Sequence, residues 1–250
     1  MTPSDSTSWE PAGEWYHGLV GSEGHYYHRH IIFPELLKLL KTKKENLSLL
    51  DMACGQGAFA KALPKNFHYE GVDISPTLIR QAKQQCPDKI FHLHDICIPF
   101  DLGKTFTHAT MILAFQNLDN PLEALRNIKH HLKQGGTLVL VLNHPCFRIP
   151  RQSSWGLDEH KKNHYRRIDI YMSRLKIPLD VHPGNKNSAH TLSFHYPLSD
   201  IFSFLQQAGF AVHHLLEWVS DKVSTGKHAK IENRARLEFP LFLTLLAKSL

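Results

Sequence analysis

Two short apolar runs, each ending in an aspartate, constrain the fold of this 250-residue chain more than any other feature. The first run ends at Asp51 and leads into the small-residue turn A-C-G-Q-G at residues 53–57, and the second ends at Asp73. Glycines let a backbone approach a ligand closely, and an acid about 20 residues further on can accept hydrogen bonds from a ribose. The pattern predicts a nucleotide-type site at the carboxyl ends of two parallel strands.

The turn differs from a dinucleotide fingerprint in two details. The fingerprint G-x-G-x-x-G has a third glycine that packs the helix on the sheet, whereas this turn continues as A-F and lacks it. Asp51 precedes the turn, where its carboxylate can contact an ammonium group. A pyrophosphate is itself an anion and does not need a carboxylate at this position. Both details disfavour an NAD-type enzyme.

Four further landmarks follow the turn in order. They are G-V-D-I-S at 71–75, H-D-I at 94–96, L-K-Q-G-G at 132–136 and L-Q-Q-A-G-F at 205–210. With these motifs the chain resembles the class I S-adenosylmethionine (SAM)-dependent methyltransferases of the small-molecule type, most weakly within 144–195. The resemblance implies an α/β fold with a Rossmann-like, doubly wound, seven-stranded sheet that is mostly parallel and has an antiparallel last strand. It also implies S-adenosyl-L-methionine as the cofactor.

The hydrophobic pattern itself predicts alternating strands and helices, and hence a parallel sheet. We expect strands at 47–52, 69–72, 90–93, 109–113 and 137–142, and helices at 34–40, 58–63, 76–85, 121–132 and 198–208. Two more strands are expected at 211–218 and 239–247. The polar link 220–238 shows no obvious helix, so these last two strands should be antiparallel neighbours.

The segment 144–196 falls outside the sheet pattern. A connection of this length in a compact domain is usually a lid or binding element, and it leaves the ligand-binding edge of the fifth strand. We therefore divide the chain into an N-terminal cap segment with a helix, 1–46, and a methyltransferase domain, 47–250, whose residues 144–196 form a substrate lid. This lid holds nine basic and four acidic residues, nearly the whole excess behind the net charge of +6. Such a field attracts anionic substrates, although a solvated basic loop would have the same composition.

Composition excludes several classes of protein. No apolar run reaches the roughly 18 to 20 residues that a membrane span needs, and residues 1–11 lack the apolar core of a signal peptide. The four cysteines form no C-x-x-C pair, which predicts reduced thiols and a cytoplasmic protein. The 19 histidines show no zinc spacing, with His25, His28 and His30 coming closest, so no metal is expected. Nothing in the sequence indicates an oligomeric state.

The resemblance assigns the methionine side of the cofactor to residues that follow two strands. The backbone at Ala53, Gly55 and Gly57 would pass beneath the methionine part of SAM. Asp51 would face its amino group, directly or through water, and Ala114 would offer its carbonyl to the same ammonium.

The adenosine side is assigned in the same way. Asp73 would accept from the ribose hydroxyls, with Ile74 against the adenine, although Asp73 could instead serve as an acid at a helix N-terminus. Asp95 would accept from the adenine amino group and Ile96 would donate its backbone amide. Arg29, in the aromatic N-terminal segment, would meet the methionine carboxylate, or else it is a cation at the start of a helix.

Two histidines are the candidates for acid–base chemistry at the methyl acceptor. His144 directly follows the fifth predicted strand, and His195 lies in the segment S-F-H-Y-P-L at 193–198. A neutral imidazole can remove a proton from an oxygen or nitrogen acceptor, and a hydrogen-bonded structural histidine is the alternative for each.

Side chains of the basic segment are candidates for binding the acceptor. Guanidinium groups suit a carboxylate or phosphate, and aromatic rings either stack on a substrate or fill the core of a lid. The candidates are Arg148, Arg151, Trp155, Tyr165 and Tyr196, with Arg166 and Arg167 as further possible anion ligands.

Two other functions are weighed against a small-molecule methyltransferase. Cys146, after the fifth strand, could be the nucleophile of a cytosine C5 enzyme acting on nucleic acid. The end of the fourth strand, L-A-F-Q-N at 113–117, lacks both the Pro-Cys pair and the Asn/Asp-Pro-Pro-aromatic motif of nucleic-acid enzymes, so a nucleic-acid partner is disfavoured. A non-catalytic SAM-binding protein is the other alternative.

Overall fold

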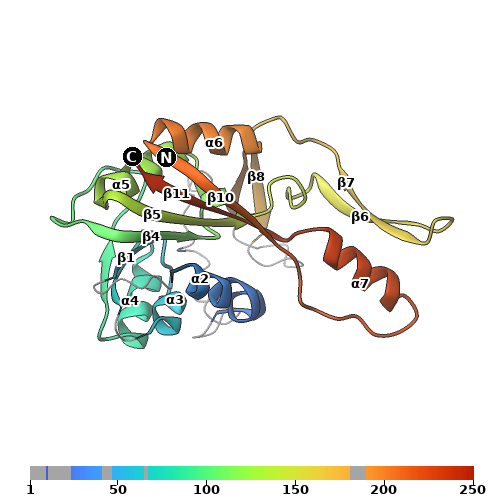
Figure 1. Ribbon diagram of the computed structural model, residues 1–250, viewed down its shortest axis with the longest axis horizontal. Coiled ribbons are helices and arrows are strands. Elements are labelled where there is room, and N and C mark those ends of the chain that lie inside the picture. Colours follow the sequence, from blue (N-terminus) through green and yellow to red (C-terminus); the bar gives the residue numbers. More distant parts are fainter. Residues whose placement is uncertain (1–9, 11–23, 41–46, 65–66, 181–189) are drawn as a thin grey trace.

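The central sheet has the strand order β10-β11-β5-β4-β1-β2-β3 (Figure 1). The computed structural model describes residues 10, 24–40, 47–64, 67–180 and 190–250. The strands are β1 Ser48–Met52, β2 His68–Asp73, β3 Ile90–Leu93, β4 Phe106–Ile112, β5 Leu132–Asn143, β10 Phe210–Trp218 and β11 Phe242–Ser249. β11 runs antiparallel to both β5 and β10, and the other pairs are parallel. The mostly parallel sheet with an antiparallel last strand is confirmed.

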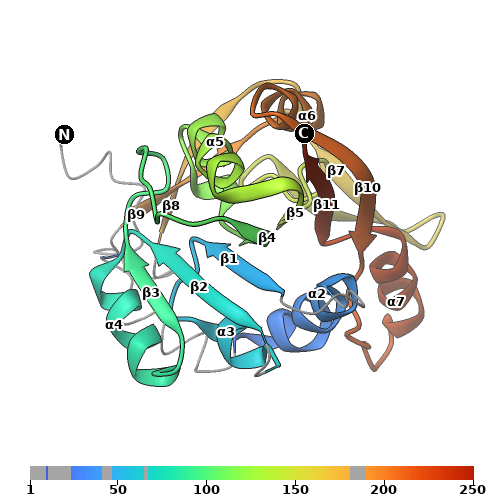
Figure 2. The ribbon, with the colours of Figure 1, turned by 60° about the vertical axis from the view of Figure 1, so that its left-hand side comes forward.

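Helices cover both faces of the sheet (Figure 2). One face carries α2 Phe33–Leu40, α3 Ala58–Ala62 and α4 Pro76–Gln85, and the other carries α5 Pro121–His131 and α6 Leu198–Gln207. Successive strand residues point to opposite faces, so Leu49 joins the core beneath α2 to α4 while Leu50 joins the core beneath α5 and α6. None of the described helices combines the length and the apolar character needed to cross a membrane.

The residues between β5 and α6 lie outside the central sheet. They form two separate antiparallel pairs, β6 Ser153–Asp158 with β7 Asn163–Ile168 and β8 Leu175–Asp180 with β9 His190–His195. The β6–β7 hairpin projects from the body of the molecule (Figure 1). These pairs lie within the segment 144–196 that the sequence sets apart as an insertion, and its role as a lid stays a prediction; residues 181–189 lie outside the described part.

The expectation that no helix occupies the polar link before β11 is wrong. Helix α7 spans Ala229–Glu238, and Ala235 is its buried residue. Its sequence lacks an apolar stripe, which is why the hydrophobic pattern does not reveal it. Tertiary contacts hold it instead, because Arg234 donates from Nη1 to Oδ1 of Asn163 on β7 at 3.1 Å.

The boundary between α5 and β5 also differs from the prediction. The helix ends at His131, and the strand already begins at Leu132 rather than at residue 137. Leu132 pairs with Phe106, and the register then shifts before the regular pairing of His108 with Thr137. The glycine pair at 135–136 therefore lies in an irregular stretch of the strand. Gly135 has a left-handed φ of 71° there.

A buried carboxylate on β2 is held by three basic side chains. Lys104 Nζ and His68 Nε2 lie 2.7 and 3.1 Å from Glu70 Oε1, and His92 Nε2 lies 2.8 Å from Oε2. Burial raises the pKa of Glu70, but hydrogen bonds and charges from Lys104 and His92 outweigh it and bring the pKa below 4.5. The contribution of ionised Glu70 to the stability of the fold is therefore complete above the pKa that Glu70 has in the unfolded chain. It is lost as the pH falls through the lower pKa that Glu70 has in the folded protein.

We predict that Lys104→Met lowers the free energy of unfolding at pH 7 by about 1–2 kcal/mol. Removing one partner of a buried pair costs about 3–5 kcal/mol, and the loss is smaller here because Lys104 is partly exposed and the histidines remain. Urea titrations at pH 7 and pH 4 measure it, and the difference between variant and wild type should shrink at the lower pH. Lys38→Met, which removes an exposed pair with Glu35, is the control and should cost less than about 0.5 kcal/mol.

Candidate functional site

The turn after β1 leaves open space beside the backbone of Gly55. Ala53, Gly55 and Gly57 have left-handed φ values of 58°, 57° and 79°. A Cβ at Gly55 would meet no heavy atom within 4 Å, so a ligand has room to lie against this backbone. Non-glycine residues seldom adopt such angles, and Leu113, at the end of the adjacent strand β4, does so as well with φ 53°. Strained residues thus end two neighbouring strands, a pattern that is common at functional sites.

Asp73, at the end of β2, fastens this turn to the sheet. Its Oδ2 accepts from the Gly55 amide at 2.8 Å, and its Oδ1 accepts from the Ser75 amide at 2.9 Å. Burial raises the pKa of the Asp73 carboxyl above 3.8 even though these amides and that of Ile74 favour its ionised form. Ile74 is 41% exposed beside it, so an apolar face adjoins the carboxylate, as an adenosine site requires.

Asp51 is buried between two hydroxyl groups. Tyr69 donates to Oδ2 at 2.9 Å and Thr110 donates to Oδ1 at 2.7 Å. Burial raises the pKa of Asp51 to about 6, against the effect of these hydrogen bonds, and the charge of Asp73 raises it further. A cation in front of this carboxylate would favour its ionised form, so the residue suits the expected ammonium group.

The other expected cofactor residues also follow strands β3 and β4, but each already has an internal hydrogen bond. Asp95 accepts from the Cys97 amide at 2.8 Å, and the carbonyl of Ile96, which is buried, accepts from Asn127 at 2.8 Å. The carbonyl of Ala114 accepts from the Asn117 amide at 2.8 Å. Their roles toward the cofactor stay predictions.

The N-terminal segment turns a different side chain inward from the one expected. Arg29 lies on the exposed side of η3 (His28–Ile32), whereas His28 is buried. The His28 ring stacks on His25, with centroids 4.1 Å apart, and its Nδ1 has no partner in the described part of the chain. Burial lowers the pKa of His28 to about 3, so the ring is neutral. The sequence analysis missed this residue, and the role of Arg29 stays a prediction.

His144 uses both of its ring nitrogens in hydrogen bonds. Nδ1 accepts from the Cys146 amide at 3.2 Å, so Nε2 carries the proton and donates to Oε1 of Glu217 on β10 at 2.7 Å. Burial lowers the pKa of His144 below 6.5, and the contact with Glu217 offsets this only in part. In this arrangement His144 fixes the turn after β5, and the lone pair of its unprotonated Nδ1 is already used by the Cys146 amide.

His195 has the same tautomer as His144, but its unprotonated nitrogen is left available. Its Nε2 donates to the Tyr171 carbonyl at 2.6 Å, which leaves Nδ1 unprotonated, and no described residue donates to it. Burial lowers the pKa of His195 below 6.5, so the imidazole is neutral at pH 7. Of the two predicted histidines, His195 has the arrangement that a general base requires.

A small cavity of about 30 Å³, room for about one water molecule, lies where β4 and β5 end. Six of its polar lining residues are Gln116, Asn143, Arg148, Ser193, His195 and Tyr196. Gln116 donates from Nε2 to the Leu113 carbonyl at 2.7 Å, while its Oε1 is buried without a partner among the described residues. The sequence analysis missed Gln116, although its place directly after the fourth strand was a usable signal. The Tyr196 hydroxyl donates to the Leu118 and Asp119 carbonyls and so supports this loop.

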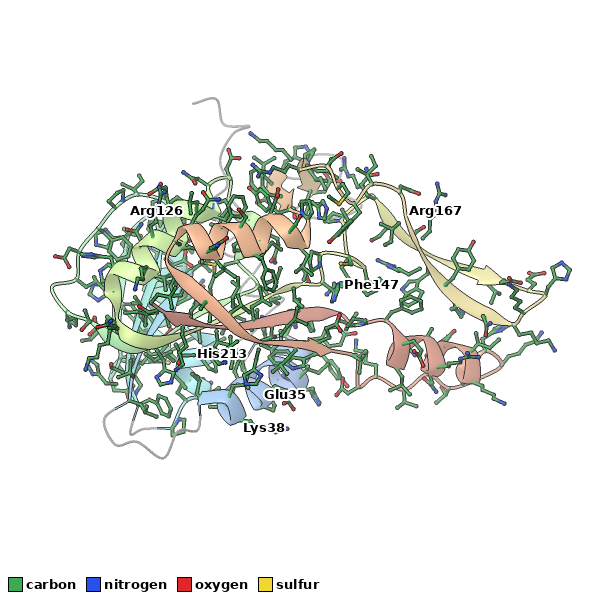
Figure 3. The ribbon with its side chains drawn as sticks, turned by 45° about the horizontal axis from the view of Figure 1, so that its top comes forward. Glu35, Lys38, Arg126, Phe147, Arg167 and His213 are labelled. Carbon is green, nitrogen blue, oxygen red and sulfur yellow. The ribbon has the colours of Figure 1, made fainter. Side chains whose placement is uncertain are left out.

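The remaining predicted acceptor residues are spread along the insertion. Trp155 and Tyr165 are 47% and 49% exposed on the β6–β7 hairpin, and Arg151 is exposed with a left-handed φ of 60°. Phe147 lies at the root of the hairpin (Figure 3) and packs edge-to-face on Phe239, which Trp155 also contacts. Tyr165 lines a second cavity of about 490 Å³ between the hairpin and α7. The structure thus gathers Arg148, His195 and Tyr196 at one cavity and places Arg151, Trp155 and Tyr165 elsewhere.

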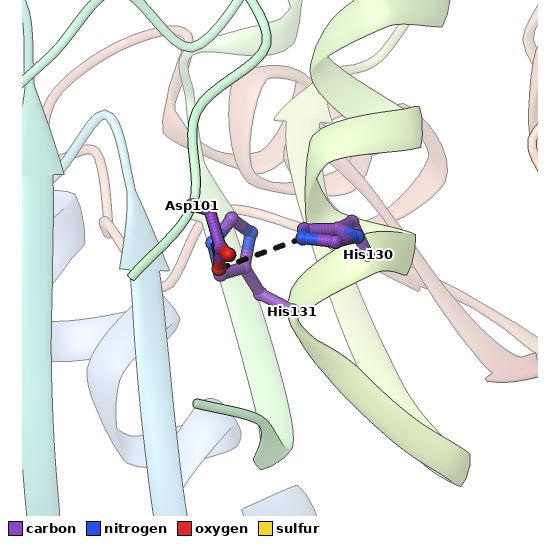
Figure 4. Close-up of side chains that lie close together, drawn as sticks. All are labelled: Asp101, His130 and His131. Atoms are coloured by element: carbon purple, nitrogen blue, oxygen red, sulfur yellow. Dashed lines mark ion pairs between the residues drawn. The ribbon is translucent and has the colours of Figure 1, made fainter. Parts of the chain in front are cut away.

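One cluster away from this edge has the composition of a metal site (Figure 4). The ligand atoms of Asp101, His130 and His131 lie within 4.8 Å of one another. His131, however, donates from Nδ1 to the Asn127 carbonyl at 2.8 Å and accepts at Nε2 from the Leu102 amide at 3.1 Å. Neither of its nitrogens has a lone pair free for a metal, so hydrogen bonds and the contact between His130 and Asp101 account for the cluster.

Comparison with known proteins agrees with this geometry. Residues 24–215 match a family model described as a methyltransferase domain. None of the curated proteins matches the chain significantly. Among solved structures, the chain is similar to a SAM-dependent methyltransferase from Mesorhizobium loti, with 22% identity over 86% of this chain and 96% of that one and a TM-score of 0.67.

Two further solved structures are similar over most of their length. CalS10, an amino pentose methyltransferase from Micromonospora echinaspora solved with SAM, has 18% identity over 94% of this chain and 97% of its own, with a TM-score of 0.64. The glycopeptide N-methyltransferase MtfA, solved with SAM, has 13% identity over 86% and 92%, with a TM-score of 0.57. At these identities the likeness concerns the fold.

We predict that Glu217→Gln lowers the pKa of His144 further, because the hydrogen bond and charge of Glu217 both raise it. The imidazole resonances of His144, followed by NMR as the pH falls, measure the change. His195 serves as the internal control, since it does not contact Glu217 and its titration should not move. A rise in the His144 pKa would contradict the assigned hydrogen bonds.

Proposed function

The chain belongs to the methyltransferase-domain family, and from that premise we propose that it transfers a methyl group from S-adenosylmethionine to a small-molecule acceptor. The observation that carries the proposal is the open turn at 53–57, fastened by Asp73 and flanked by the buried Asp51. SAM, when bound, supplies a methyl group on a positively charged sulfur. The protein's contribution to such a displacement is mainly to align the reactants and exclude water.

The residues present suit this cofactor. The turn at Gly55 leaves space for a ligand against its backbone, and Asp51 is a carboxylate whose burial suits a cationic partner. Gln116 Oε1 and His28 Nδ1 are buried polar atoms without partners in the described chain, as expected beside a site for a polar ligand. Asp73, with its adjoining apolar Ile74, supports the adenosine assignment.

The acceptor would be bound at the ends of β4 and β5, beside the cofactor turn at the end of β1. His195 would act as the base there and take a proton from the attacking oxygen or nitrogen at its Nδ1. The carbonyl of Tyr171 supports this role, because it holds the ring in the required tautomer. His144 would instead keep the turn after β5 in place through Glu217.

The acceptor class, the lid role of residues 144–196 and a cytoplasmic location are parts of the same proposal. The four cysteines are free thiols in the structure, in keeping with a reducing compartment. The backbone amide of Cys146 donates to His144 Nδ1, which gives this residue a structural place in the turn after β5.

We predict that Asp73→Ala weakens binding of S-adenosylhomocysteine by about 10- to 100-fold, because hydrogen bonds to charged groups contribute about 1.5–3 kcal/mol. Calorimetry with SAM and S-adenosylhomocysteine measures the affinity. Asp88→Ala, at an exposed position, is the control and should bind as the wild type does. Binding of NADH without binding of SAM would refute the proposal.

We predict that His195→Gln reduces methyl transfer by about 10²- to 10⁴-fold while S-adenosylhomocysteine still binds. Turnover of labelled SAM with a low-molecular-weight cell extract measures the loss, and mass spectrometry identifies the product. Wild-type activity should fall as the pH drops through the His195 pKa, below 6.5, because the base is then protonated. The exposed His213 (Figure 3) provides the control variant His213→Gln, which should retain activity.

A further inference from the structure

Two arginines at the root of the insertion, Arg148 and Arg166, have no carboxylate at ion-pair distance in the described part of the chain. Other arginines nearby do have one. Arg167, the neighbour of Arg166 on β7, pairs with Asp169 at 2.6 Å, and Arg174 pairs with Asp200 at 2.5 Å. Arg151, which also has no carboxylate partner among the described residues, is exposed to solvent, whereas Arg148 and Arg166 lack a counterion while partly buried.

The guanidinium of Arg148 is half-buried and fixed by neutral groups. Its Nη1 donates to Oδ1 of Asn143 at 2.8 Å and to the Leu241 carbonyl at 3.4 Å. Its Cζ lies 5.5 Å from the ring centroid of Phe242. These contacts hold Arg148 where β5 ends and β11 begins, and they leave donors of the group unused.

Arg166 reaches the same place from the hairpin. Its Nε donates to the carbonyl of Phe147, the residue before Arg148, at 2.7 Å, and its Nη2 donates to Oγ of Ser153 at 2.8 Å. Its Cζ lies 5.1 Å from the ring centroid of Trp155. The aromatic ring and the two hydrogen bonds fix the orientation of this guanidinium as well.

The positive charge of Arg166 acts on Arg148, and both side chains are partly removed from water. Burial lowers the pKa of Arg148, and the charge of Arg166 lowers it further, while the nearby Tyr27 has the opposite effect. The same field reaches His25, whose pKa is lowered by burial and by the charges of Arg148 and Lys222. An oxyanion between the guanidinium groups would offset this cost and use their free donors.

We propose that Arg148 and Arg166 form an oxyanion site that binds the carboxylate or phosphate of the methyl acceptor, which is therefore an anionic small molecule. The inference rests on the proposed function, since it concerns the acceptor of that reaction. Arg148 lines the same cavity as His195, which places one of the two arginines beside the proposed base. The remaining alternative is that the anion is the methionine carboxylate of the cofactor itself.

The test uses the whole protein and small anions. S-adenosylhomocysteine binding is measured first, and then inorganic phosphate and, separately, acetate are titrated into the protein with and without saturating S-adenosylhomocysteine. We expect at least one anion to bind in the presence of S-adenosylhomocysteine. Arg148→Gln and Arg166→Gln should each weaken that binding tenfold or more. The better-bound anion indicates whether the acceptor carries a phosphate or a carboxylate.

Matched variants distinguish loss of the positive charge from loss of folding as the cause of weaker anion binding. Arg167→Gln removes a neighbouring arginine that already has its carboxylate, and its anion affinity should stay within twofold of the wild type. Arg148→Lys and Arg166→Lys keep the charge and should retain most of the binding, with thermal unfolding as the check on folding.

Three outcomes would overturn the oxyanion site. They are no binding of either anion to the wild type, equal binding by the glutamine variants, and loss of anion binding once S-adenosylhomocysteine is present. The last would assign the arginines to the cofactor. Failure of S-adenosylhomocysteine to bind at all would instead remove the proposed function, while the anion titration of the free protein would still report on the arginines.

Discussion

The carboxylate of Asp73 accepts amide hydrogens from both Gly55 and Ser75, and the cofactor edge of the sheet depends on these two bonds. The bond from Gly55 ties the turn after β1 to the end of β2, and the bond from Ser75 fixes the turn that follows β2. The Ser75 amide that Asp73 holds belongs to the residue whose Oγ caps α4 by accepting from the Leu78 amide. One buried group therefore sets the shape of the turn and the start of a helix together.

The position of the turn that we propose for the cofactor could be predicted from the sequence, because its residues directly follow strands. Asp51 and Asp73 end apolar runs, and the turn chemistry between them is local. Helix α7 could not be predicted in this way, since its contacts come from a hairpin more than sixty positions away, such as Asn163 with Arg234. The early start of β5 was missed for a related reason, because a bulged pairing with β4 overrides the glycine pair that normally ends a helix.

For the residues proposed to act on the methyl acceptor, the residue type alone does not predict the role of each side chain. His144 and His195 are equivalent in sequence terms, yet one donates to a carboxylate on β10 and accepts from an amide, while the other donates to a single carbonyl. The difference is made by partners distant in the chain, Glu217 for His144 and Tyr171 for His195. Gln116 follows the fourth strand, but the feature that marks it, a buried oxygen without a partner among the described residues, can be seen only in the folded structure.

The pairing of Asn143 with Phe242 joins the last residue of β5 to the first of β11. The insertion begins after Asn143, and the segment that contains α7 ends before Phe242. Both segments are therefore attached to the sheet at the same residue pair. Loop closure between fixed ends costs little more for a long segment than for a short one. The segments that we propose to face the acceptor can therefore be lengthened, shortened or replaced while the sheet and the turn after β1 stay as they are. A scaffold of this kind can acquire new substrates without changing its supply of methyl groups.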